Sequence, residues 1–144
     1  MIMILLKALK NTAVIKIRFF KQSNISMKVR LAIVGSRSFN DYEQLKSEIL
    51  KNYNCNEMEC IISGGACGTD SLAERFAHEF NIPLVVYKAE WNKYGKSAGA
   101  IRNHYIIRDC THCIAFWDGV SPGTARDIQL CKKLGKITLI KNIS

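Results

Sequence analysis

Three glycine-containing segments, each directly after a short apolar run, carry the residues best suited to bind an anion. They are residues 35–39 (GSRSF), 63–70 (SGGACGTD) and 118–124 (DGVSPGT). Glycine lets backbone N–H groups approach an anion closely, and a helix that begins after the turn presents the positive end of its dipole to the same anion. Three such turns in one chain predict the rim of a phosphate-binding crevice.

Hydroxyl and charged side chains within these segments add groups that can contact a phosphate or a sugar. Arg37 follows the first apolar run, where its guanidinium can hold a phosphate through two parallel hydrogen bonds. In the second segment, Ser63 and Thr69 supply hydroxyl groups beside three glycines. The ligand-binding residues predicted in the three segments are Gly35, Ser36, Arg37, Ser63, Gly64, Gly65, Gly68, Thr69, Asp70, Asp118, Gly119, Ser121, Gly123 and Thr124.

Asp127 admits two interpretations. Thr124 and Asp127 have the spacing of a helix N-cap and the third residue of that helix, so Asp127 would only cap the helix. The same placement would put its carboxylate at the crevice, where it could accept hydrogen bonds from ribose hydroxyls or stabilise a developing ribosyl cation. The spacing by itself favours capping, and both interpretations stay open at this point.

The six cysteines form no pattern that predicts a metal site. Cys110 and Cys113 make a Cys-x-x-Cys pair, which supplies half of a tetrahedral zinc site, but no second pair has matching spacing. Without a secretory signal, reduced thiols are expected, and small buried cysteines fill apolar space. We therefore predict a cytoplasmic protein with no metal and no required cofactor.

The elements that must position these groups alternate between strand and helix. Apolar runs and helical spacing predict strands at 29–34, 59–63, 84–87, 113–117 and 137–140, and helices near 41–51, 71–80, 98–109 and 124–134. This alternation predicts a single α/β Rossmann-like domain with a mostly parallel five-stranded sheet, strand order 3-2-1-4-5, and helices on both faces. Ligands bind such sheets at the carboxyl ends of the strands, beside the point where the strand order reverses, so the three segments should converge there.

The net charge of +9 is concentrated at the N-terminus. Residues 1–26 contain five basic residues and no acidic residue, whereas the rest of the chain has sixteen basic and twelve acidic residues, a net charge of +4. We predict a basic extension, 1–26, and a nucleotide-binding domain, 27–144. The extension is interpreted as a segment appended before Met27, as an extra edge strand at 13–19, or as a basic amphipathic anchor. Its longest apolar stretch of six residues is too short to cross a membrane.

Several motifs in order resemble one known family. Residues 35–39, 63–73 (SGGACGTDSLA), 89–91 (AEW) with Gly95, the pairs 98–99 (AG) and 102–103 (RN), and 116–124 (FWDGVSPGT) are similar to the YspA/YpsA-related (YAcAr-type) branch of the SLOG superfamily. The resemblance covers Lys28 to about Ile140. It implies a Rossmann-like fold and a nucleotide or nucleotide-derived ligand, such as a relative of ADP-ribose or NAD. More distant members include LONELY GUY phosphoribohydrolases and DprA, and many members of this branch occur in phages and bacteria.

The resemblance also implies roles for individual residues. Arg102 and Asn103 match an Arg-Asn signature, with Arg102 as a phosphate partner. Thr124 with Asp127 is similar to the Gly-Thr-x-x-Glu of the phosphoribohydrolases, whose glutamate is catalytic, although aspartate is one methylene shorter. Three functions follow: a sensor or processing module for a small nucleotide ligand, a phosphoribohydrolase with Asp127 and Arg102 as catalytic residues, and single-stranded DNA binding like that of DprA. A charge of +4 gives the DNA alternative little support, and a homodimer is left open.

Overall fold

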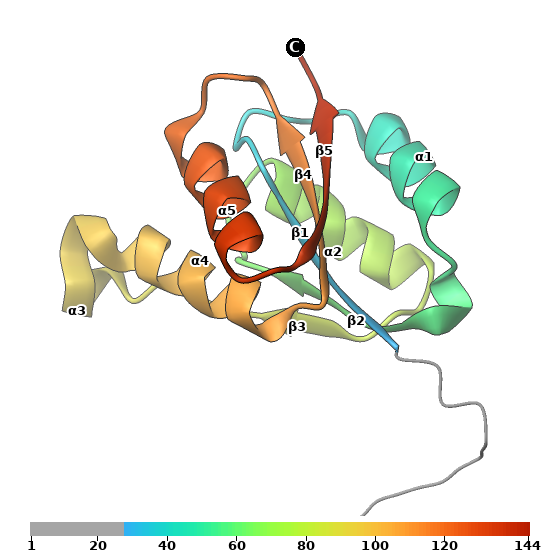
Figure 1. Ribbon diagram of the computed structural model, residues 1–144, viewed down its shortest axis with the longest axis horizontal. Coiled ribbons are helices and arrows are strands. Elements are labelled where there is room, and N and C mark those ends of the chain that lie inside the picture. The colour runs from blue at the N-terminus through green and yellow to red at the C-terminus, as the bar shows by residue number, and fades with distance from the viewer. Residues whose placement is uncertain (1–27) are drawn as a thin grey trace, which may run out of the picture.

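The computed structural model describes residues 28–144, which form one parallel sheet of five strands between two layers of helices (Figure 1). The strand order is β3-β2-β1-β4-β5, so the predicted fold class and strand order are confirmed. The strands are β1 (Val29–Gly35), β2 (Met58–Ser63), β3 (Leu84–Val86), β4 (His112–Trp117) and β5 (Ile137–Asn142). The helices are α1 (Tyr42–Asn52), α2 (Thr69–Glu79), α3 (Trp91–Tyr94), α4 (Ala98–Asp109) and α5 (Pro122–Lys133), with short 3-10 helices η2 (Cys55–Glu57) and η3 (Gly95–Ser97).

The central strand β1 shows why the sequence forms this sheet. Leu31, Ala32, Ile33 and Val34 are all buried, because β1 pairs with β2 on one side and with β4 on the other and is covered on both faces. A strand covered on both faces reads as a continuous apolar run rather than as an alternating one. Successive side chains nevertheless point to opposite faces, so Leu31 and Ile33 enter one core cluster and Ala32 and Val34 enter the other.

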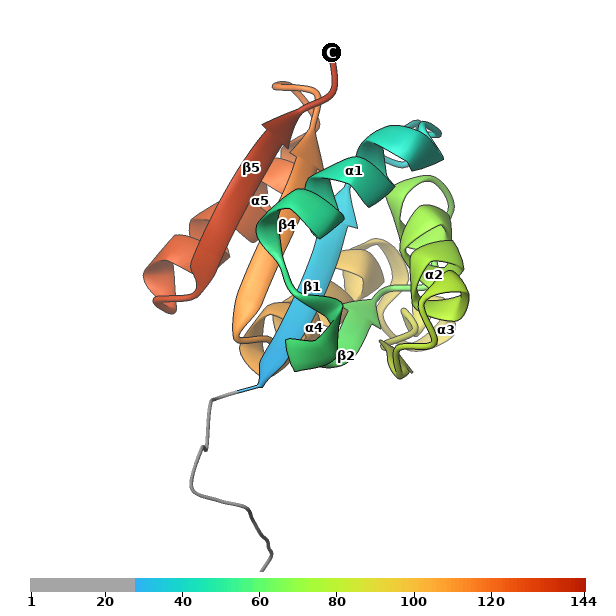
Figure 2. The ribbon, with the colours of Figure 1, turned by 90° about the vertical axis from the view of Figure 1, so that its right-hand side faces the viewer.

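Each core cluster belongs to one face of the sheet. Helices α1 and α2 cover one face, and α4 and α5 cover the other (Figures 1 and 2). Leu45, Ile49 and Phe76 fill the first cluster from α1 and α2. Ile106 and Ile107 from α4, together with Cys131 from α5, fill the second. The sheet is therefore a rigid base from which the loops at its carboxyl edge project.

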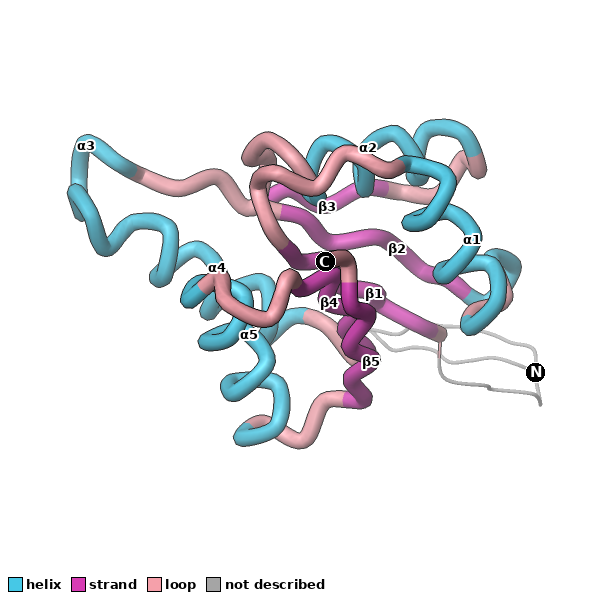
Figure 3. The backbone as a smooth tube through the Cα atoms, turned by 90° about the horizontal axis from the view of Figure 1, so that it is seen from above, coloured by secondary structure: helices cyan, strands magenta, loops and turns pink. Residues whose placement is uncertain are grey.

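The segment between β3 and α4 extends beyond the sheet. No helix or strand was predicted for residues 89–96, yet they contain α3 and most of η3, which continue directly into α4. Figure 3, viewed from the side on which β4 and β5 end, shows this arm projecting past the sheet. The arm ends on the long helix α4, so the orientation of α4 decides where the arm lies.

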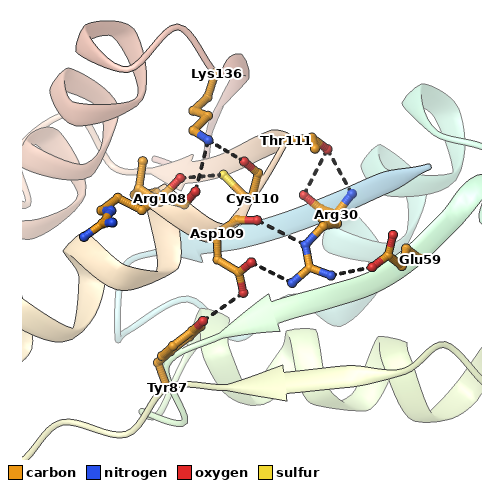
Figure 4. A network of polar contacts seen from close by, with 9 residues as sticks. Arg30, Glu59, Tyr87, Arg108, Asp109, Cys110, Thr111 and Lys136 are labelled. Carbon is orange, nitrogen blue, oxygen red and sulfur yellow. Dashed lines mark hydrogen bonds and ion pairs between the residues drawn. The ribbon is translucent and has the colours of Figure 1, made fainter. Parts of the chain in front are cut away.

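A polar network fixes that orientation at the far end of α4 (Figure 4). Arg30, at the start of β1, donates from Nη2 to Asp109 Oδ1 at 2.6 Å and from Nε to the Asp109 carbonyl at 3.1 Å. Tyr87 Oη donates to the other Asp109 oxygen at 2.9 Å, and Arg30 also pairs with Glu59. These bonds anchor the C-terminus of α4 beside the first residues of β1 and β2, so its N-terminal half lies toward the carboxyl ends of the strands.

Two predicted helix starts were wrong, and some predictions lie outside the described residues. α2 begins at Thr69 and α5 at Pro122, each two residues earlier than predicted. The extension 1–26, with its alternative interpretations as an edge strand or an anchor, lies outside residues 28–144. Within that range, no helix combines the length and apolar character needed to cross a membrane.

Candidate functional site

A cleft of about 1040 Å³ lies at the carboxyl ends of β1, β2 and β4, where the three glycine-containing segments meet. β1 is followed by the first segment and β4 by the third, so the cleft lies at the reversal of strand order. The predicted residues that line it are Gly35, Ser36, Arg37, Gly64, Gly65, Asp70, Arg102, Asn103, Asp118, Ser121, Gly123, Thr124 and Asp127. Segments up to about ninety residues apart in the chain therefore meet at one site, as the sequence predicted.

Four predicted ligand-binding residues, Ser63, Gly68, Thr69 and Gly119, do not line the cleft. Thr69 is fully buried, with its Oγ1 donating to the Ser36 carbonyl at 2.8 Å and its backbone N–H to the same oxygen at 3.2 Å. Ser63 is also buried, and its Oγ accepts the Gly65 N–H at 3.5 Å. These hydroxyl groups hold the first two segments in shape, because an unpaired buried hydroxyl would be costly.

Gly68 lets the first two segments touch. Its φ of 72° is in a region that side-chain-bearing residues avoid, and a Cβ there would lie 2.2 Å from the Arg37 carbonyl oxygen. Gly64 makes a second close approach, because a Cβ would lie 2.8 Å from the Arg102 guanidinium carbon. Glycine at position 64 therefore makes room for the arginine, which packs directly on the loop backbone.

Arg102, Asn103 and Asp127 form a continuous chain of hydrogen bonds across the cleft. Arg102 donates from Nη1 to the Gly64 carbonyl and from Nε to Asn103 Oδ1, both at 2.6 Å. Asn103 Nδ2 donates in turn to both carboxylate oxygens of Asp127, at 3.1 Å each. Because the arginine occupies the amide oxygen, the amide nitrogen must face the carboxylate. The chain links α4 to the second segment and to α5.

The interpretation of Asp127 as a helix cap was wrong. α5 begins at Pro122 with Ser121 at the N-cap position, so Asp127 is the sixth residue of the helix and lies too far along it to cap. Proline is favoured at the first helical position, since its fixed φ suits the helix and its missing N–H is not needed there. The Asp127 carboxylate instead lies in the cleft wall, only 6% exposed.

Burial raises the pKa of Asp127 to about 6, and the negative charge of Asp70 contributes in the same direction. The hydrogen bonds from Asn103 and the positive charge of Arg102 partly oppose this increase. Burial likewise raises the pKa of Asp70, whose carboxylate accepts the Ala66 N–H at 3.1 Å. The buried carboxylate of Asp127 and the partly buried carboxylate of Asp70 thus lie in one cleft with Arg102.

Asp118 has a different role from Asp127. Its Oδ1 accepts the Val120 and Ser121 N–H groups at 2.9 and 2.7 Å, and its Oδ2 accepts the Ser121 hydroxyl at 2.6 Å. These bonds, those of Ser121 above all, lower the pKa of Asp118. The indole of Trp117 donates to the Ser121 carbonyl at 3.1 Å. Asp118 and Trp117 therefore hold the backbone of the third segment in its conformation through hydrogen bonds.

Sequence reasoning missed part of the cleft. Besides the predicted residues, the lining includes one aromatic and several basic side chains, namely Lys88, Trp91, Lys96, His104 and Arg126. Most of these lie after β3, in or beside residues 89–96, for which no helix or strand and no strand-to-helix glycine turn was predicted. With Arg37 and Arg102, the cleft has five lysine and arginine side chains against three aspartates. The balance favours an anionic ligand.

The described part of the chain contains no group of three or more His, Cys, Asp or Glu side chains placed to hold a metal ion. Cys110 and Cys113 are both buried in the second core cluster. Cys67 is exposed and lines the cleft, with its Sγ 3.8 Å from the Arg37 carbonyl oxygen.

The fold resembles that of DNA processing protein A (DprA). DprA from Streptococcus pneumoniae matches with a TM-score of 0.66 and 19% identity, over 81% of this chain and 51% of that one. A structure of DprA from Helicobacter pylori, described as showing its single-stranded DNA binding mode, matches with a TM-score of 0.62 and 18% identity, over 79% of this chain and 65% of that one. The chain thus spans about half to two thirds of these proteins, and the likeness concerns the fold.

Sequence comparison shows a nearer relationship. The Gene 61 protein of Mycobacterium phage D29 is 32% identical over 117 residues, which cover 74% of this chain and 90% of the phage protein. Residues 29–94, from β1 to the end of α3, match the family described as YspA, cpYpsA-related SLOG. These residues include the first two glycine segments and Trp91. The chain therefore belongs to the YspA, cpYpsA-related SLOG family.

Proposed function

We propose that the cleft binds a nucleotide or nucleotide-derived ligand through its phosphate and ribose, as a sensor or processing module. The observation that carries this proposal is the convergence of three glycine turns and five basic side chains at the reversal of strand order. Glycine turns expose backbone N–H groups, and arginine matches the geometry of a phosphate. The membership in a SLOG family supports the same ligand class.

The hydrogen bonds of Arg102 suit it to hold a phosphate. Nε donates to Asn103 Oδ1 and Nη1 donates to the Gly64 carbonyl, and these two hydrogen bonds fix the plane of the guanidinium. The Nη2 donors make no hydrogen bond to residues 28–144 and are available for an anion in the cleft. Asp127 lies on the other side of Asn103, where its carboxylate can accept the hydrogen bonds of ribose hydroxyls.

A phosphoribohydrolase is the second candidate, and the position of Asp127 favours it. A largely buried carboxylate with a pKa of about 6 can stabilise positive charge on ribose C1′ and take a proton from water near neutral pH. Water would attack C1′, the N-glycosidic bond would break, and the base would leave with the bonding electrons and a proton. A nucleoside monophosphate and water would give ribose 5-phosphate and free base.

Thermal unfolding of the full chain with separate ligands tests these candidates. The ligands are AMP, GMP, CMP, UMP, NAD, ADP-ribose, ribose 5-phosphate and an oligo-deoxythymidine strand, with mass spectrometry of each mixture for products. A sensor gains thermal stability and leaves its ligand intact, since binding to the folded state raises the unfolding temperature. A hydrolase releases ribose 5-phosphate, and Asp127→Asn abolishes the release.

The oligonucleotide separates small-ligand binding from the DNA alternative that the DprA-like fold raises. Binding of the strand should weaken steeply with salt if it is electrostatic, and should depend on the five basic residues of 1–26. The proposal of a small nucleotide ligand is wrong if the strand stabilises the protein while no mononucleotide, dinucleotide or sugar phosphate does. In the same assay, Arg102→Ala should reduce the thermal stabilisation that a nucleotide gives. Lys133→Ala, at the far end of α5, is the control and should keep it.

A further inference from the structure

Trp91 is a large apolar side chain that the protein leaves exposed inside the cleft. It begins α3, is 53% exposed and lines the cleft. Most tryptophan side chains are largely buried, because burial of their apolar surface stabilises the fold. An exposed indole within a charged cleft therefore offers a flat surface to a ligand.

Gly99 places this ring beside Arg102. A Cβ at Gly99, in the first turn of α4, would lie 3.4 Å from Trp91 Cη2 and 3.8 Å from Arg102 Nη2. The indole edge and the guanidinium thus lie on either side of the small space that a side chain at position 99 would fill. A group held by Nη2 and a group stacked on the indole would be neighbours, as the phosphate and base of one nucleotide are.

The basic residues and the volume of the cleft also suit a ligand with both a phosphate and a base. Lys88 and Lys96 line the cleft on the sequence stretches before and after α3, so basic side chains flank Trp91 in the sequence and share the cleft with it. Pockets for small ligands span about 300–1000 Å³, and this cleft, at about 1040 Å³, has room for a base beyond the phosphate and ribose.

We propose that Trp91 is the base-stacking platform of the cleft, so that the ligand is a nucleotide whose aromatic base lies on the indole while Arg102 holds its phosphate. This rests on the proposed nucleotide site and extends it to the base. Stacking accepts any base, because every base has a π face. The platform therefore selects for a base without selecting among bases, and discriminates against sugar phosphates.

Binding of AMP, GMP and UMP, and separately of ribose 5-phosphate, is measured by calorimetry on the full chain and on three variants. Trp91→Ala should weaken binding of each nucleotide about fivefold or more, the loss of one base–aromatic stack, and leave binding of ribose 5-phosphate unchanged. Trp91→Phe should retain most of the nucleotide affinity, because phenylalanine keeps an aromatic face. Tyr94→Ala is the matched control, since Tyr94 is an exposed aromatic residue on α3 outside the cleft lining.

Tryptophan fluorescence gives an independent readout. The chain has two tryptophans, and nucleotide binding should quench the emission of the wild type, whereas Trp91→Phe, which keeps only Trp117, should show little quenching. Equal nucleotide affinity in wild type and Trp91→Ala, or ribose 5-phosphate bound as tightly as AMP, overturns the platform while leaving the phosphate–ribose site in place. No binding of any nucleotide or of ribose 5-phosphate to the wild type removes the proposed function itself. Capture of an oligo-deoxythymidine strand alone would assign the ring to nucleic acid instead.

Discussion

Asp127→Asn should make the protein more stable near neutral pH, although it removes a residue of the candidate site. The folded-state pKa of Asp127 is about 6, against an ordinary value of 3.8. A carboxyl group whose pKa is raised by folding stabilises the folded state while protonated. That contribution is fully present below pH 3.8 and is lost as the pH rises through about 6.

The shift sets the expected magnitude. At 1.36 kcal/mol per pH unit, the ionised carboxylate costs the folded state about 3 kcal/mol above the folded-state pKa. Asparagine carries no charge and keeps the shape, but its amide nitrogen would face Asn103 Nδ2 and lose one hydrogen bond, a cost of about 1 kcal/mol. The variant should therefore be about 2 kcal/mol more stable than wild type near pH 8.

The assay is urea unfolding of wild type and variant across a pH series. Linkage predicts that the advantage of the variant falls by about 2 kcal/mol between about pH 8 and pH 4.5, whatever the cost of the lost hydrogen bond. Asp118→Asn is the control of opposite sign, because the pKa of Asp118 is lowered and its ionised form supports the third segment. A stability difference for Asp127→Asn that does not change with pH would refute the reasoning.

Three further predictions concern the groups around the cleft. Asn103→Ala should raise the pKa of Asp127 above its wild-type value, since the hydrogen bonds of Asn103 favour the charged carboxylate; carboxyl NMR titration measures this. Gly68→Ala should destabilise the fold by about 2–5 kcal/mol, whereas Gly119→Ala, at a φ of 86° with open space around it, should cost about 1 kcal/mol in urea unfolding. Asp109→Ala should cost about 1–3 kcal/mol and speed amide exchange in α4, because Arg30 and Tyr87 lose their shared partner.

Each of these has a result that contradicts it. An unchanged titration of Asp127 in Asn103→Ala would mean that the amide does not stabilise the charged form. Equal losses of stability in the two glycine variants would show that the approach of Gly68 to the Arg37 backbone has no energetic role. Unaltered exchange in α4 of Asp109→Ala would show that core packing, not the network in Figure 4, holds the helix.

Local patterns in the sequence were enough to predict the sheet and the place of the cleft. The buried run of β1 and the alternation of apolar runs with helical spacing define a parallel sheet, since strands covered on both faces must be apolar throughout. Right-handed crossovers place the helices on both faces of such a sheet, and the predicted strand order, 3-2-1-4-5, is the one observed. Pro122 indicates the start of α5, but the Thr124–Asp127 spacing, read as a helix cap, placed the predicted start two residues too late.

Tertiary structure alone decided which side chains in the cleft act on one another. Asn103 reaches Asp127 from another helix, Gly64 accepts Arg102 onto its backbone, and Trp91 comes to Arg102 across Gly99. These contacts depend on where α4 lies over the sheet, which Arg30 and Asp109 fix from its opposite end. The sequence by itself determines the elements and the glycine turns because these depend on neighbouring residues. Contacts between elements depend on packing across the sheet, and no local spacing encodes them.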